Sequence, residues 1–147
     1  MNREEQIDRI QVALGERLLK VRRPQENRLY LDVEATVIPE SARLLSDQLQ
    51  ARFQTASGVD APREIEILYH WVFDAIELVV TVCTKVDRQQ PELPSIAGIC
   101  PAAEWIEREM WELLGISFPG HPDQRHLLLD DEWPEGKYPL RRDYQKD

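Results

Sequence analysis

The chain has 147 residues and a formal net charge of −9. This length fits one domain with a tail, and 42% hydrophobic with 31% charged residues is the balance of a folded globular protein. The acidic charge disfavours binding to nucleic acid and to anionic lipid surfaces.

The N-terminus and the cysteines indicate a cytoplasmic protein. Cys83 and Cys100 are too few for a disulfide framework or a four-thiolate metal site, so we expect reduced, buried thiols. No apolar stretch of signal-peptide type follows the charges at residues 3–5, and no run approaches the roughly 20 apolar residues of a spanning helix. We therefore expect a soluble chain that reaches a membrane only through a partner.

The first segment predicts an amphipathic helix. Apolar residues recur at steps of three and four from Ile7 to Val21. Asn2 is the expected cap, with Glu5 as the returning acid of a capping box. We expect the helix to end at Pro24.

The middle of the chain predicts strands and a second helix. The alternating run at residues 29–33 indicates a half-buried strand, and Pro39 suits the first turn of a helix. A short strand is expected near residues 53–57. The clearest hairpin joins alternating runs at residues 65–73 and 78–86.

A third helix is predicted from about Pro101 to Leu114, with Gly115 as its C-terminal stop. Its expected inner stripe is Ile106, Met110, Leu113 and Leu114. The order of elements implies an α+β fold, in which residues 1–115 form a two-layer domain with helices packed on a mixed, mostly antiparallel sheet.

Residues 116–147 form an irregular C-terminal arm that contains four prolines and shows no sustained period. Its apolar and aromatic side chains need a surface to bury against. That surface is either the arm's own domain or, as we expect, a partner protein.

Two groups of side chains are candidates for chemistry. Four carboxylates lie along the third helix, namely Glu104, Glu107, Glu109 and Glu112. Paired carboxylates could act as general acids and bases, but a solvated or partner-facing charged face is the favoured interpretation. His121, Asp123 and His126 are metal ligands by type, yet they sit in a Pro-rich loop, so turn and hydrogen-bonding roles are favoured. We expect no active site and no cofactor in this chain.

The third helix and the arm resemble a known family. The motif runs W-I-E-R-E from Trp105, G-H-P-D from Gly120, W-P-E-G from Trp133 and P-L-R-R-D-Y from Pro139. Three upstream segments match as well, at residues 57–60, 69–71 and 93–96. The chain is similar to the 30 kDa subunit family of respiratory complex I and to the related subunit of membrane-bound energy-converting nickel–iron hydrogenases.

The resemblance implies a non-catalytic subunit in the peripheral arm of a membrane-bound electron-transfer complex. Its partners would be the large subunit (49 kDa-like or hydrogenase large) and the small subunit that carries an iron–sulfur cluster. Those clusters, and a nickel–iron or quinone site, would lie in the partners. The chain would lie at the inner face of the cell membrane through the complex. The alternative is a free-standing small metal-binding protein or enzyme that uses His121, Asp123 and His126.

We expect the arm to wrap a partner subunit, and we expect Glu107, Arg108 and Glu109 to point sideways or outward as assembly elements. The predicted partner-contact residues are Trp105, Glu107, Arg108, Glu109, His121, Asp123, Arg125, Trp133, Arg141, Arg142, Asp143 and Tyr144.

Overall fold

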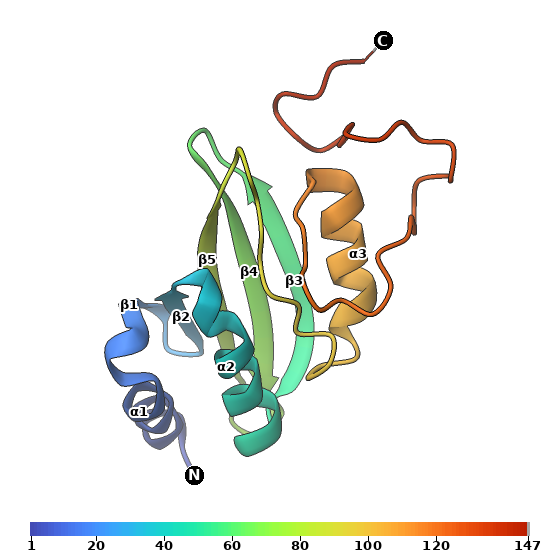
Figure 1. The fold of residues 1–147 in the computed structure, drawn as a ribbon. Helices are drawn as coiled ribbons and strands as arrows, with labels where there is room; N and C mark the ends of the chain where they lie inside the picture. The colour runs from blue at the N-terminus through green and yellow to red at the C-terminus, as the bar shows by residue number, and fades with distance from the viewer. Residues whose placement is uncertain (147) are drawn as a thin grey trace.

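The computed structural model describes residues 1–146, and in this range five strands form one sheet in the order β1-β2-β5-β4-β3 (Figure 1). The strands are β1 (Leu18–Gln25), β2 (Arg28–Val33), β3 (Arg52–Asp60), β4 (Glu64–Phe73) and β5 (Leu78–Asp87). The helices are α1 (Arg3–Leu14), α2 (Ile38–Ala42), which continues as a π-helical segment over Arg43–Gln48, and α3 (Ala103–Leu114). Short 3-10 turns lie at Gly15–Arg17, Ala35–Val37 and Asp74–Ile76.

The sheet is mixed and mostly antiparallel, as predicted. β2 pairs with β5 in parallel, whereas the pairs β1–β2, β3–β4 and β4–β5 are antiparallel. The predicted hairpin is β4–β5. Its residues pair without a register shift, from Glu64 opposite Asp87 to Phe73 opposite Leu78. The α+β two-layer class is therefore confirmed.

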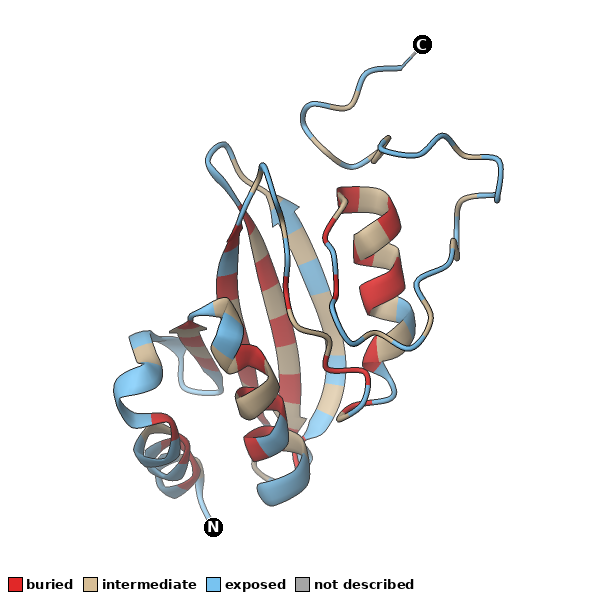
Figure 2. Ribbon diagram, in the orientation of Figure 1, coloured by how far each residue is buried: buried red, intermediate tan, exposed pale blue. Residues whose placement is uncertain are grey.

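One face of the sheet carries the core. Buried and half-buried residues alternate along β4, which Figure 2 shows as red and tan bands. Tyr69 lies opposite Val82, which lies opposite Leu31 on β2, and all three are fully buried. The helices pack on this face, and the buried residues of α1 and α2 belong to the same cluster. The period of two along the strands has thus assigned the faces correctly.

The first helix is shorter than predicted. The Asn2 capping box is present, but the helix ends at Leu14 because Gly15 takes a positive φ of 53°. Residues 18–25, whose spacing predicts a continued helix, instead form β1 and pair with β2. Val21 is 38% exposed and does not extend the buried stripe of Ile7, Ile10 and Leu14.

The third helix is placed as predicted and packs against β3. It ends at Gly115, which has a φ of 77°. Of the four residues predicted for its inner stripe, Met110 and Leu114 are buried, whereas Ile106 and Leu113 are half-buried. A Cβ at Gly58 of β3 would lie 2.5 Å from Cδ1 of Leu114, so glycine permits this close approach. After the helix, residues 117–119 pair with residues 91–95, and Phe118 is fully buried.

Candidate partner-binding site

A buried carboxylate joins α3 to two other parts of the chain. Glu107 is 0% exposed and accepts a hydrogen bond from the Tyr69 hydroxyl of β4 at 3.0 Å. It also accepts from the Ser95 hydroxyl at 2.5 Å and from the Ile96 N–H at 3.1 Å. Burial raises the pKa of Glu107 above its ordinary value, although the three donors oppose the shift. The prediction that Glu107 points outward is wrong, because its side chain lies between α3, β4 and residues 95–96.

Two further side chains of α3 hold the backbone of the arm. Arg108, 8% exposed, donates to the carbonyl groups of Arg125 at 2.9 Å and His126 at 2.8 Å. Glu112, 1% exposed, accepts three successive backbone N–H groups, those of Leu127 (3.0 Å), Leu128 (2.7 Å) and Leu129 (3.1 Å). The outward direction predicted for Arg108 is therefore also wrong. Since both groups bond to backbone atoms, α3 fixes the path of residues 125–129.

Glu112 and Glu107 differ in their electrostatics. Burial alone would raise the pKa of Glu112, but the N–H groups of Leu128, Leu127 and Leu129 outweigh it and hold the pKa below its ordinary value. Glu112 is thus favoured as a carboxylate, which is the form that can accept these hydrogen bonds.

An ion-pair cluster fastens the end of the arm to the C-terminal end of β3. The Asp60 side chain, 3% exposed, pairs with Arg88 at 3.2 Å and accepts the backbone N–H of Arg142 at 2.6 Å. Arg141 donates to the Arg88 carbonyl at 3.1 Å and pairs with Asp143 at 3.0 Å. Several charges of the P-L-R-R-D-Y motif are therefore engaged by the chain's own domain.

Aromatic side chains order the same region. Trp133 stacks on Tyr144, with ring centroids 6.3 Å apart. The Tyr138 ring lies against Gly115, where a Cβ would come within 2.6 Å of the ring. Part of the arm thus packs on its own domain: after running beside α3 (Figure 1), it returns to the domain at Leu140, whose N–H bonds to the Leu113 carbonyl, and at Arg142.

The predicted partner-contact residues fall into three groups by exposure. The exposed ones are Trp105, Arg125, Arg142 and Asp143. The half-buried ones are Glu109, His121, Asp123, Trp133, Arg141 and Tyr144. The buried ones are Glu107 and Arg108. The large apolar side chains most open to a partner on α3 and the arm are Trp105 (64% exposed), Leu128 (63%) and Leu140 (60%).

The residues proposed as metal ligands make hydrogen bonds within the chain. The His121 ring contacts the Glu104 carbonyl through Nε2 at 2.8 Å and accepts the Asp123 N–H through Nδ1 at 2.9 Å. His126 Nδ1 lies 3.2 Å from Glu112, and its ring lies against Trp111. Among residues 1–146, no group of three or more His, Cys, Asp or Glu side chains is arranged to hold a metal ion. The metal-binding alternative is not favoured.

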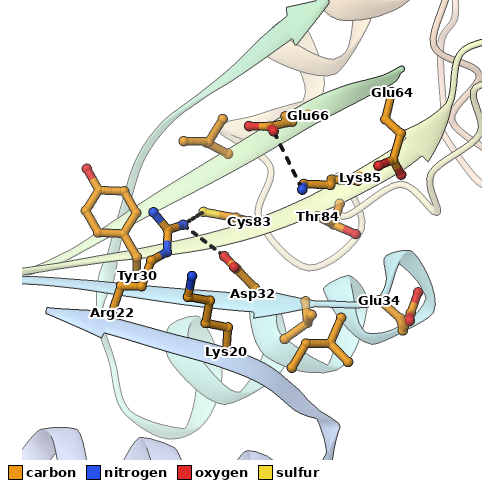
Figure 3. Close-up of a pocket in the computed structure, with 13 residues that line it drawn as sticks. Lys20, Arg22, Tyr30, Asp32, Glu34, Glu64, Glu66, Cys83, Thr84 and Lys85 are labelled. Carbon is orange, nitrogen blue, oxygen red and sulfur yellow. Dashed lines mark hydrogen bonds and ion pairs between the residues drawn. The ribbon is translucent and has the colours of Figure 1, made fainter. Parts of the chain in front are cut away.

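The face of the sheet opposite the helices carries a shallow groove (Figure 3). Arg22 pairs with Asp32 at 3.0 Å and its guanidinium lies 5.0 Å from the centre of the Tyr30 ring. Cys83 is half-buried beside them, and burial raises the pKa of its thiol to about 11. A thiol with so high a pKa is a weak nucleophile near neutral pH, so the groove does not support cysteine chemistry.

Sequence reasoning missed several residues that build the site. Tyr69, Ser95 and Asp60 are absent from the predicted site residues, and Glu112 enters the prediction only as a surface carboxylate. A signal for them existed, because Asp60, Tyr69 and the pair 95–96 lie in the upstream segments that carry the resemblance. The structure shows that these segments contact the third-helix and arm motifs directly.

The fold and this site define a small α+β domain whose motif residues fasten an ordered arm. Residues 31–147 match the family model described as the respiratory-chain NADH dehydrogenase 30 Kd subunit. The chain belongs to this family.

Named relatives agree with this assignment. The chain is 35% identical over 123 residues to a subunit of the NADH-quinone oxidoreductase of Moorella thermoacetica, and the match covers 78% of this chain and 82% of that one. It is 33% identical over 120 residues to a subunit of the F(420)H(2) dehydrogenase of Methanosarcina mazei, covering 77% and 75%. The NADH-quinone oxidoreductase relatives from two Salinispora species are longer, and the chain spans 56% of their length.

A solved structure is also similar. A chain of the membrane-bound sulfane sulfur reductase, an archaeal respiratory membrane complex, superposes with a TM-score of 0.81 and 26% identity, over 97% of this chain and 85% of that chain. Within residues 1–146, no helix is both long and apolar enough to span a bilayer. The relatives are thus named as subunits of larger oxidoreductases or belong to a membrane-bound complex.

Proposed function

We propose that this chain is a non-catalytic scaffold subunit in the peripheral part of a membrane-bound electron-transfer complex. It would join the large subunit to the small iron–sulfur subunit, in an assembly of the energy-converting hydrogenase or NADH:quinone oxidoreductase type. The clusters, and a nickel–iron or quinone site, would belong to those partners.

One observation carries this proposal most directly. The motif residues of α3 hold the arm by its backbone instead of lining a cavity with convergent reactive groups. The buried side chains of Arg108 and Glu112 fix the arm, and Trp105, Leu128 and Leu140 stay exposed. This combination is expected of a surface that a partner protein covers. The names of the relatives, which are subunits of oxidoreductases, support the same class.

Copurification tests the proposal. An affinity-tagged copy that replaces the native chain should bring down a large, iron-containing assembly from detergent-solubilised membranes. Nickel content and quinone reduction by that assembly would distinguish the two types. Recovery of the tagged chain as a free monomer, with the assembly intact in its absence, would contradict the scaffold role.

A further inference from the structure

An open cavity lies where the end of the arm meets the loop that follows β5. Its volume is about 570 Å³, and residues 88–91 and 136–145 supply most of its walls. Among residues 1–146, four charged side chains line it, namely Arg88, Lys137, Arg141 and Asp143. Three of these four are basic, so the cavity is locally positive in a chain whose net charge is −9.

One carboxylate oxygen lies between two of these cations. Oδ2 of Asp143 is 3.0 Å from Nη2 of Arg141 and 3.7 Å from Nη2 of Arg88. Oδ1 of Asp143 also accepts from Nε of Arg141 at 3.2 Å. These contacts hold the pKa of the Asp143 carboxyl group below its ordinary value, first through the hydrogen bond from Arg141. Asp143 therefore marks a position at which an oxygen anion is stabilised.

The two arginines are fixed in the structure, whereas the carboxylate between them is not. The side chains of Arg88 and Arg141 are 14% and 11% exposed, and that of Asp143 is 62% exposed. Arg88 is held by Asp60 at 3.2 Å, and Arg141 by the carbonyl of Arg88 at 3.1 Å. Since the ion pairs of an exposed carboxylate contribute little to stability, an anion from solution can replace Asp143 while the arginines stay in place.

Both guanidinium groups also keep donors for a larger anion. A guanidinium group carries more N–H donors than one carboxylate can use. Within residues 1–146, no hydrogen bond engages Nη1 of Arg141 or Nε of Arg88. A phosphate group offers more acceptor oxygens and more negative charge at neutral pH than a carboxylate, so two arginines can share it.

We propose that the cavity beside Arg88 and Arg141 binds the phosphate group of a small soluble molecule, which takes the place of the Asp143 side chain. The cavity has the volume of a small-molecule site, and Tyr138 and Tyr144 add aromatic surface to its walls. A lipid headgroup is the disfavoured source of the phosphate, because the acidic chain is repelled by an anionic membrane surface. The site is separate from the scaffold role, since it needs no partner subunit.

The test titrates the purified full-length chain with inorganic phosphate at neutral pH and constant ionic strength. Binding is followed by NMR through the Nε–H signals of Arg88 and Arg141. Arg141→Gln removes one guanidinium group, and Asp143→Asn removes the competing carboxylate. The matched controls are Arg9→Gln and Asp131→Asn, which change the net charge equally at exposed positions away from the cavity lining.

We expect saturable binding of phosphate that shifts the signals of Arg88 and Arg141. Arg141→Gln should weaken this binding at least about tenfold, because a charge-assisted, bidentate donor is lost. Asp143→Asn should tighten it at least about threefold, because the wild-type site is partly occupied by its own carboxylate. Both controls should stay within about twofold of the wild type. Tighter binding cannot result from misfolding, so Asp143→Asn decides the question even if Arg141→Gln loosens the arm.

Three results would overturn the inference, and all of them leave the scaffold proposal standing. The first is phosphate binding that does not saturate. The second is saturable binding that neither Arg141→Gln nor Asp143→Asn changes, since the phosphate would then lie elsewhere. The third comes from vesicles of phosphatidylcholine with phosphatidic acid. Sedimentation of the chain with these vesicles, without a response to inorganic phosphate, would assign the two arginines to a lipid surface.

Discussion

At the scale of single residues, two carboxylates on one helix are shifted in opposite directions. The pKa of Glu107 is raised, first by burial, whereas that of Glu112 is lowered because backbone donors overcome burial. Because its pKa is raised in the folded state, the Glu107 carboxyl group contributes fully to folding stability below its ordinary pKa. This contribution is lost as the pH rises through the pKa of the folded state. For Glu112 the order is reversed, and its contribution is lost as pH falls.

Replacement of Glu107 by glutamine tests this sign. The amide oxygen can still accept from Tyr69 and Ile96, and the amide can donate to Ser95, while the charge is gone. We expect Glu107→Gln to gain stability relative to the wild type as the pH rises from about 4 to about 8, because the wild type loses the contribution of its raised-pKa carboxyl group over this range and the amide does not titrate. Urea unfolding at both pH values measures the difference.

Glu109→Gln is the control for that experiment, because it removes the same charge from a half-buried neighbour on the same helix. The pH dependence that belongs to Glu107 is the difference between the two variants. If the difference in unfolding free energy between Glu107→Gln and the wild type stays constant from about pH 4 to about pH 8, folding does not raise the pKa of Glu107, and the prediction is wrong.

At the scale of secondary-structure elements, the contact between α3 and β3 depends on the absence of one side chain. Gly58 faces Leu114 at a separation that leaves no room for a Cβ. Its φ is not in the left-handed region, so the requirement is steric and does not arise from backbone strain.

Gly58→Ala should therefore destabilise the fold by about 1–3 kcal/mol, the usual cost of overpacking. Gly98→Ala is the matched control, because nothing lies within 4 Å of its Cβ position. Denaturant unfolding of the two variants measures the effect. Equal stabilities would mean that Leu114 moves aside without cost.

Sequence periodicity predicted most elements but misplaced one. The run from Leu18 to Val21 satisfies the helical spacing and also fits a strand, and Gly15 was the signal that decided between them. A glycine inside an apparent helical pattern is a weak signal, because helices tolerate it at a modest cost. The structure of β1 depends on pairing with β2, which periodicity within one segment does not describe.

The motifs directed attention to α3 and the arm, but the contacts predicted for Glu107 and Arg108 were wrong. Glu107 and Arg108 were predicted to point sideways or outward because the inner stripe of the helix was assigned to Ile106, Met110 and Leu113, but Ile106 and Leu113 are only half-buried. The partners of Glu107 and Arg108 lie far away in the sequence, on β4 and in the arm. Contacts between residues so far apart in the sequence leave no periodic pattern within one segment. The burial of Glu107 and Arg108 could therefore not be predicted from the pattern of the helix alone.

At the scale of the whole molecule, side chains of α3 join the arm to the domain through hydrogen bonds to the arm backbone. We expect Arg108→Ala to leave the purified chain folded but to reduce the amount of assembled complex, because the arm backbone loses two charge-assisted hydrogen bonds. Activity per assembled complex should stay near normal. Native gels of solubilised membranes, scored for assembly and activity, provide the measurement.

Arg9→Ala is the control for this variant, since Arg9 is exposed on α1. Full assembly of the Arg108→Ala chain into an inactive complex would point instead to a direct part for this helix in proton or electron transfer.

The parallel pairing of β2 with β5 has a consequence for how the chain is synthesised. Residues 34–77 separate the two strands, so the β1–β2 hairpin leaves the ribosome long before its neighbour exists. A two-stranded hairpin is at best marginally stable in water. Stable folding of the N-terminal half therefore requires that β5, which ends at Asp87, has emerged from the ribosome. A nascent chain stopped before that residue would leave Leu29, Leu31 and Val33 exposed to chaperones or to aggregation.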